Sequence, residues 1–104
     1  MTPAVVLLAL QLLNGPLGLA PCTVVLRVRV EPKAENRSVE VTLTSPDFSS
    51  ASLQQLDGLQ APKTQRQQTY PDLPRGEYEI RAIVQRVGQR DLIVRAPFLC
   101  AGPP

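Results

Sequence analysis

The segment from Thr69 to Val84 constrains the fold more than any other part of the chain, because it joins a corner to an alternating strand. Pro71 and Pro74 fix their own φ angles, and Gly76 can adopt the positive φ values that a tight turn can require. After this corner, apolar residues fall at every second position, which is the period of a β-strand with one buried face. The segment therefore predicts a corner followed by a half-buried strand, whose buried face carries Tyr78, Ile80, Ala82 and Val84.

The same alternation recurs in short runs along the chain. Residues 23–30 and 38–44 alternate apolar with polar residues, and they could form an antiparallel hairpin. Residues 77–85 and 91–98 flank a Gly-containing turn and predict a second hairpin. Internal repeats are not visible, and no amphipathic helix follows the first twenty residues. The spacing of the runs predicts an all-β fold, a small antiparallel β-sandwich of about six to seven strands.

The stretch between residues 45 and 70 gives a weaker pattern. Phe48 is expected to fill part of the core, and we expect a short strand from about residue 52 to 56. The turn dipeptide Asp57-Gly58 would end that strand. The Gln-rich residues that follow fit either a loop or an edge strand. We favour an edge strand near residues 64–70, because edge strands carry charged residues and proline.

The first twenty residues carry the pattern of a secretory signal peptide. A ten-residue, mainly apolar run, residues 4–13, is followed by Asn14-Gly15-Pro16 and by small residues. The run is too short to span a membrane, which takes about 20 residues. Because no Lys or Arg precedes it, a buried N-terminal helix is the alternative interpretation. We expect cleavage after Ala20, a secreted or periplasmic location, a β-sandwich domain over residues 21–100 and a flexible tail at 101–104.

The two cysteines, Cys22 and Cys100, lie at opposite ends of the predicted domain. In an oxidising compartment such a pair predicts one disulfide, which for a ring of this length stabilises the fold by about 4.5 kcal/mol in the loop-entropy model. Such a bond favours six or eight strands, or a folded-back terminus, because the two ends must meet. Two alternatives remain open. Leu19-Ala20-Pro21-Cys22 has a vague similarity to a bacterial lipobox, in which the cysteine is lipidated, and the two thiols could also stay separate.

The hexapeptide Leu73-Pro74-Arg75-Gly76-Glu77-Tyr78 reads L-P-x-G-x-Y. It resembles the start of a late strand in prealbumin-like (transthyretin-like) β-sandwiches, which include carboxypeptidase regulatory-like and collagen-adhesin B-type domains. The resemblance covers these residues and the following strand, and it implies a β-sandwich with an inward tyrosine. The isopeptide crosslink of collagen-adhesin B-type domains is not expected, because the first strand has Arg27 and Arg29 in place of a lysine and the last strand has no asparagine.

Residue types suited to catalysis are scarce. The chain has no histidine, which removes the commonest general base and metal ligand. If both cysteines are oxidised, no thiolate remains to act as a nucleophile or to bind zinc. Glu77 and Glu79 share a strand face, where carboxylates usually serve as solvating charges. The sequence also lacks phosphate-loop and calcium-loop patterns. We therefore expect no enzymatic activity, no cofactor and no metal.

The remaining functions are binding and assembly, and we expect a protein partner. The net charge is +2 and the basic residues alternate along strands, so nucleic acid is not expected. Ile83 and Ile93 fall on the nominally polar faces of adjacent strands, flanked by Arg81 and Arg95, a composition that interfaces favour. Contacts between strands, or coverage by the Gln-rich segment, are the alternative.

Two further expectations complete the sequence-based hypothesis. The alternative to a binding module is a structural or accessory prealbumin-like subunit of a larger secreted or envelope complex, and self-association is open in either case. The triplet Asn36-Arg37-Ser38 matches the N-glycosylation motif, which makes Asn36 a candidate glycosylation site if the source is a eukaryote.

Overall fold

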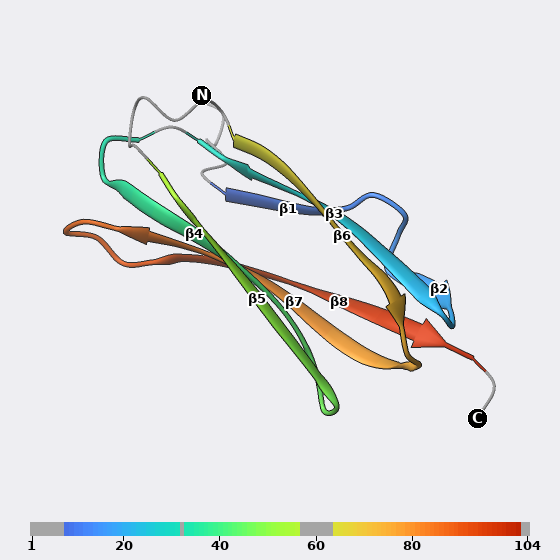
Figure 1. Ribbon diagram of the computed structural model, residues 1–104. Helices are drawn as coiled ribbons and strands as arrows, with labels where there is room; N and C mark the ends of the chain where they lie inside the picture. The colour runs from blue at the N-terminus through green and yellow to red at the C-terminus, as the bar shows by residue number, and fades with distance from the viewer. Residues whose placement is uncertain (1–7, 32, 57–63, 103–104) are drawn as a thin grey trace, which may run out of the picture.

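The computed structural model describes residues 8–31, 33–56 and 64–102, which form two packed β-sheets (Figure 1). These residues contain eight strands and no helix. The strands are β1 (Leu8–Leu12), β2 (Leu17–Leu19), β3 (Cys22–Val30), β4 (Asn36–Ser45), β5 (Phe48–Gln55), β6 (Thr64–Leu73), β7 (Gly76–Arg86) and β8 (Leu92–Ala101). The predicted all-β sandwich is confirmed.

One sheet has the order β1-β3-β6 and the other has the order β2-β8-β7-β4-β5. All neighbours are antiparallel except β2 and β8, which run parallel. The predicted hairpin between β7 and β8 is confirmed, as is an edge strand over residues 64–70, which belong to β6. The predicted hairpin between residues 23–30 and 38–44 is wrong, because β3 and β4 lie in different sheets. β5 begins at Phe48 and is longer than the strand expected over residues 52–56.

Residues expected to form a leader contribute two of the eight strands. β1 pairs with β3 in one sheet, and β2 then pairs with β8 in the other. The structure is that of the chain with these residues present, so cleavage after Ala20 stays a prediction. At the other end, β8 runs to Ala101, the first residue of the predicted tail, and residues 103–104 lie outside the described part. The predicted turn dipeptide Asp57-Gly58 is also outside it.

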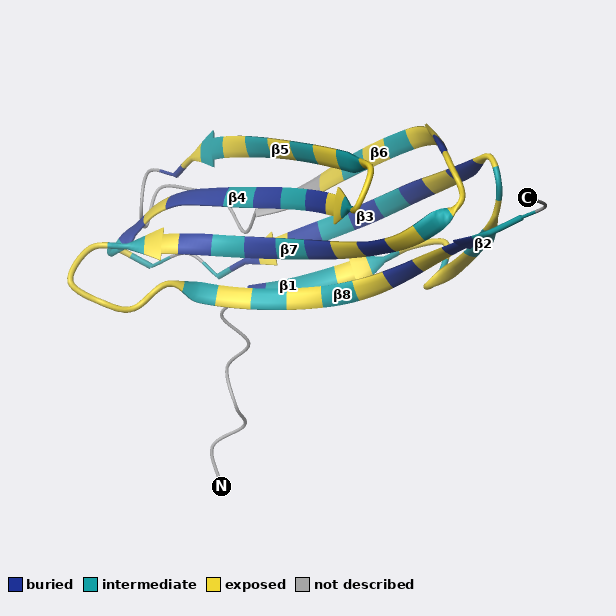
Figure 2. Ribbon diagram, turned by 90° about the horizontal axis from the view of Figure 1, so that it is seen from below, coloured by how far each residue is buried: buried dark blue, intermediate teal, exposed yellow. Residues whose placement is uncertain are grey.

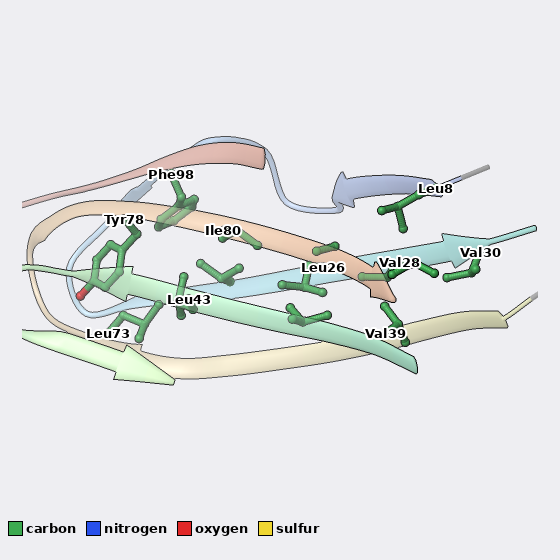
Figure 3. Close-up of a cluster of buried hydrophobic side chains, with 14 of the residues drawn as sticks. Leu8, Leu26, Val28, Val30, Val39, Leu43, Leu73, Tyr78, Ile80 and Phe98 are labelled. Atoms are coloured by element: carbon green, nitrogen blue, oxygen red, sulfur yellow. The ribbon is translucent and has the colours of Figure 1, made fainter. Parts of the chain in front are cut away.

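The core lies between the two sheets and follows the alternation of the sequence (Figure 3). Along β3, β4 and β7, every second side chain points inward and is buried, because successive residues of a strand face opposite sides of the sheet. Each fully buried aliphatic side chain stabilises the fold by about 1.5–3 kcal/mol relative to an exposed one. The buried apolar residues of these strands are Cys22, Val24, Leu26, Val28, Val30, Val39, Val41, Leu43, Tyr78, Ile80, Ala82 and Val84.

Tyr78 anchors the corner where the chain passes from β6 in one sheet to β7 in the other. Its side chain is 3% exposed, and its hydroxyl donates a hydrogen bond to the carbonyl oxygen of Pro74 over 2.6 Å. Burial raises the pKa of this phenol above its ordinary value. A tyrosine corner of this kind also fixes a sheet-to-sheet connection in immunoglobulin-type sandwiches. Gly76 has a positive φ of 159°, as the sequence allowed, and Asp72 has the left-handed conformation at this corner, with φ of 58°.

Cys22 and Cys100 are joined across the same end of the sandwich. Their Cα atoms are 6.0 Å apart, which is a usual separation for a disulfide. The bond connects the start of β3 to the end of β8, and the six strands from β3 to β8 satisfy the parity expected from the sequence. Of the three alternatives for these cysteines, the structure contains the disulfide.

Candidate functional site

The solvent face of the five-stranded sheet brings the predicted contact residues together. We call this surface the outer face; it is the side of β4, β5, β7 and β8 that points away from the core (Figure 2). Ile83 and Ile93 are direct partners across β7 and β8, and so are Arg81 and Arg95. The sequence predicted this neighbourhood correctly, because all four residues share the outward phase of two strands that form one hairpin.

The apolar residues form a row across the sheet. In the β4–β7 and β4–β5 pairs, Glu40 lies opposite Ile83 on one side and opposite Leu53 on the other. Leu53 is 56% exposed and Ile93 is 49% exposed, whereas Ile83 between its neighbours is half-buried. The apolar row therefore consists of Leu53, Ile83 and Ile93, with Glu40 as its polar member.

A charged row runs beside the apolar row. Arg81 and Arg95 face each other, and like charges in this position repel. Glu79 relieves the repulsion, because its Oε1 lies 2.9 Å from Nη2 of Arg81 and 3.8 Å from Nε of Arg95. Both ion pairs are exposed, so each contributes at most about 1 kcal/mol to stability. Nε of Arg81 is buried and has no hydrogen-bond partner among the described residues.

An open groove of about 820 Å³ continues the outer face toward the β4–β5 turn. Its walls are mainly apolar and proline-rich, and it also holds carboxylates: Pro16, Pro46, Glu77, Glu79, Arg95, Pro97 and Leu99 are among its lining residues. Glu79 is already paired with two guanidinium groups, and Arg81 does not line the groove. The groove offers shape and mixed polarity for a contact.

Sequence reasoning missed Leu53 as a member of this face. The run Phe48–Gln55 contains few apolar residues, so its phase cannot be read from alternation alone. The phase follows from pairing with β4, which sets Leu53 opposite Glu40 and turns both outward. Glu40 is the sequence signal that could have indicated this phase. Its charge places it on the outward side of β4, and any residue of β5 that pairs with it must face outward too.

Asn36, the candidate glycosylation site, lies inside the fold. It is 2% exposed, and its Nδ2 donates a hydrogen bond to the carbonyl oxygen of Glu31 over 2.9 Å. Ser38 of the same triplet is also buried and donates to Oε1 of Gln85. The register of β4 against β7 shifts between Asn36 and Ser38, so that Asn36 lies opposite Arg86, whereas Ser38 lies opposite the exposed Gln85. A glycan on this nitrogen would have no room while the domain stays folded.

Comparisons with known proteins give no relative for this chain. No protein-family model, no curated protein and no solved structure matches it. Within residues 8–31, 33–56 and 64–102, no group of three or more His, Cys, Asp or Glu side chains could hold a metal ion. The same residues contain no helix long and apolar enough to cross a membrane.

Proposed function

We propose that this chain is an exported, non-catalytic module that binds a protein partner through the outer face of its five-stranded sheet. The observation that carries the proposal is the register pair of the half-buried Ile83 and the exposed Ile93, beside the pair Arg81–Arg95. Folding normally removes β-branched apolar side chains from water, so an apolar row on a solvent face needs another reason to be there. The disulfide between Cys22 and Cys100 fits an oxidising, exported location.

The composition of this face matches that of protein interfaces. Interfaces are enriched in arginine, and an arginine at their centre often contributes strongly to affinity. Arg81 is partly covered by its neighbours, so its guanidinium is held in place before a partner arrives. Coverage by the Gln-rich segment is not supported for its described part, because β6 lies in the other sheet.

The alternative is a structural or accessory subunit of a larger secreted or envelope complex, as the prealbumin-like resemblance suggests. A self-assembling subunit is expected to have a mainly polar surface and one paired edge. The exposed Leu53 and Ile93 favour the binding module over this alternative. Sedimentation of the purified chain distinguishes the two, since a self-assembling subunit would form a defined oligomer without any partner.

The test is the double substitution Ile83→Thr with Ile93→Thr. Both changes keep a β-branched side chain, so strand propensity is retained while the apolar surface is lost. The variant and the wild-type chain are used to capture partners from the secretory fraction of the source, and captured proteins are quantified by mass spectrometry. Val87→Thr is the control, because Val87 is exposed at the β7–β8 turn, away from the row.

We expect an unchanged melting temperature, since surface substitutions usually change stability by less than about 0.5 kcal/mol. We also expect the double variant to lose a captured protein that the wild type and the control retain. A large drop in melting temperature would show that the isoleucines support the core. Equal capture by all three chains would remove the outer face as the contact surface.

A further inference from the structure

The edge of β3 is covered by a strand that lies outside the covalently closed part of the domain. The disulfide closes residues 22–100 into a ring, and β1 and β2 precede it. β1 is the outermost described strand of its sheet, and it pairs with β3 from Leu8 opposite Val30 to Leu12 opposite Leu26. Removing β1 would therefore remove no strand of the ring that the disulfide closes.

β1 fills a defined space as well as an edge. Leu8 is 7% exposed and lies beside Val28 and Val30 in the core (Figure 3). Leu10 and Leu12 follow at every second position and pack against the same cluster. Without these three side chains, an apolar trough would open along the inner side of β3. A trough lined by buried aliphatic residues favours an apolar replacement over water.

The backbone of β3 adds directional hydrogen bonds to this trough. The amide of Leu13 donates to the carbonyl oxygen of Val25 over 2.8 Å, and the amide of Val25 donates to Oδ1 of Asn14 over 3.3 Å. Both backbone groups of Val25 thus point to the N-terminal segment. In an antiparallel sheet these directions alternate, so the backbone groups of Arg27 and Arg29 point the same way. Losing β1 would leave a row of open donors and acceptors on β3.

The predicted cleavage after Ala20 falls between β2 and Cys22, and it would remove both N-terminal strands. We propose that the edge of β3 in the exported chain is an acceptor site for an extended segment of a partner protein. The segment carries apolar side chains at every second position and pairs antiparallel with residues 26–30, in the place that β1 occupies in this structure. In this mode the main-chain bonds give affinity and the alternate side chains give specificity.

An extended segment fits this site better than a second copy of the same edge. Two β3 edges pairing antiparallel would bring the arginines at positions 27 and 29 opposite one another, and like charges there are destabilising. The inward residues of a second β3 would also stay in their own core, so nothing would replace Leu8. The acceptor site rests on the export that the proposed function assumes. It belongs to the three-stranded sheet and is separate from the outer face, so binding at either surface can fail without the other.

The experiment uses the full chain expressed in a secretory host and purified after export. Intact mass determines the N-terminus, which we expect at Pro21. The probe is a fluorescent peptide with the sequence of residues 8–14 and two added lysines for solubility. The control peptide has serine in place of the leucines at positions 8, 10 and 12. We expect saturable binding of the probe with a micromolar Kd, and binding of the control peptide weaker by at least about tenfold.

Two proline variants test the geometry of the site. Arg29→Pro removes a donor that faces the probe, and it should weaken binding by about five- to tenfold, the effect of one lost backbone hydrogen bond. Thr69→Pro is the matched control. Val25 lies opposite Thr69 but directs its backbone groups to the N-terminal segment, so the amide of Thr69 points to the outer edge of β6.

The possible outcomes separate clearly. An exported chain that keeps residues 1–20 would overturn the proposal, because its own β1 would occupy the site. Failure of the cleaved chain to bind the probe, or equal binding by Arg29→Pro and the wild type, would also overturn it. If the cleaved chain precipitates without a peptide, we expect the probe to keep it in solution and the control peptide to fail to do so. Equal precipitation with the probe and with the control peptide would count against the site.

Discussion

The hydroxyl and the ring of Tyr78 contribute to stability in separable ways, and two substitutions measure them. Tyr78→Phe keeps the ring and removes the 2.6 Å hydrogen bond to the carbonyl oxygen of Pro74. Tyr78→Ala removes the ring as well, together with its contacts to Phe48 and Phe98, whose centroids lie 6.2 and 6.4 Å away. The comparison isolates the corner hydrogen bond from the packing of the aromatic cluster.

The expected magnitudes follow from burial and from the fate of the freed acceptor. Loss of one hydrogen bond usually costs about 0.5–1.5 kcal/mol. Pro74 is exposed, so its carbonyl can bind water in the variant, and we expect about 1 kcal/mol for Tyr78→Phe. Truncation of a buried aromatic residue to alanine costs about 3–5 kcal/mol. That approaches the whole stability of a domain this small, at about 0.05–0.15 kcal/mol per residue.

The assay is urea unfolding followed by far-UV circular dichroism, because the chain has no tryptophan. We expect a lower midpoint for Tyr78→Phe with an unchanged m-value, and a partly or fully unfolded Tyr78→Ala. Tyr70→Phe is the control, since the Tyr70 side chain is only half-buried. A loss below about 1 kcal/mol for Tyr78→Ala, the scale of surface changes, would refute the inward phase of β7 and with it the assignment of the core.

Because burial raises the pKa of Tyr78, the unfolded chain loses the phenol proton first as the pH rises past the ordinary value of 10.0, and stability should fall from that pH upward. In urea midpoints measured across this range, Tyr78→Phe should lose the part of the pH dependence of stability that comes from this phenol. The same pH dependence in the variant and the wild type would contradict the prediction. Reduction of the Cys22–Cys100 bond should add about two daltons to the intact mass and lower the free energy of unfolding by about 4–5 kcal/mol. Alkylation of both thiols without reductant would disprove the bond. Asn36→Ala should lower the free energy of unfolding by about 1–3 kcal/mol, because the carbonyl of Glu31 loses its hydrogen-bond partner. The intact mass of the wild-type chain from a eukaryotic secretory host should show no glycan. A glycosylated chain with wild-type stability would contradict the buried placement of Asn36.

Much of the candidate site was predictable because it lies within one local unit. The hairpin of β7 and β8 places Ile83 opposite Ile93 through a turn of a few residues, so phase and register are set by nearby sequence. Leu53 joins the same face from β5, and its register depends on β4. The burial of Asn36 also escaped prediction, since the short motif around it looks like an exposed loop, whereas it belongs to β4 beside a register shift against β7.

The sequence by itself determined which side of each well-patterned strand faces the core, as Tyr78 and Val24 illustrate. That information is local, because alternation depends on the two-residue period of the backbone and on the removal of apolar side chains from water. The disulfide could also be anticipated, because terminal cysteines have few other partners in a domain that is expected to be exported.

Which strands become neighbours was decided by the tertiary structure. Residues 23–30 and 38–44 each read as strands and would satisfy their alternation equally well as a hairpin, yet they lie in opposite sheets. Both arrangements bury the same side chains of β3 and β4. They differ in what those side chains face, because two layers pack the inner faces of β3 and β4 against each other, whereas a hairpin would set them side by side. That difference arises from packing between residues far apart in the chain, which no local pattern contains.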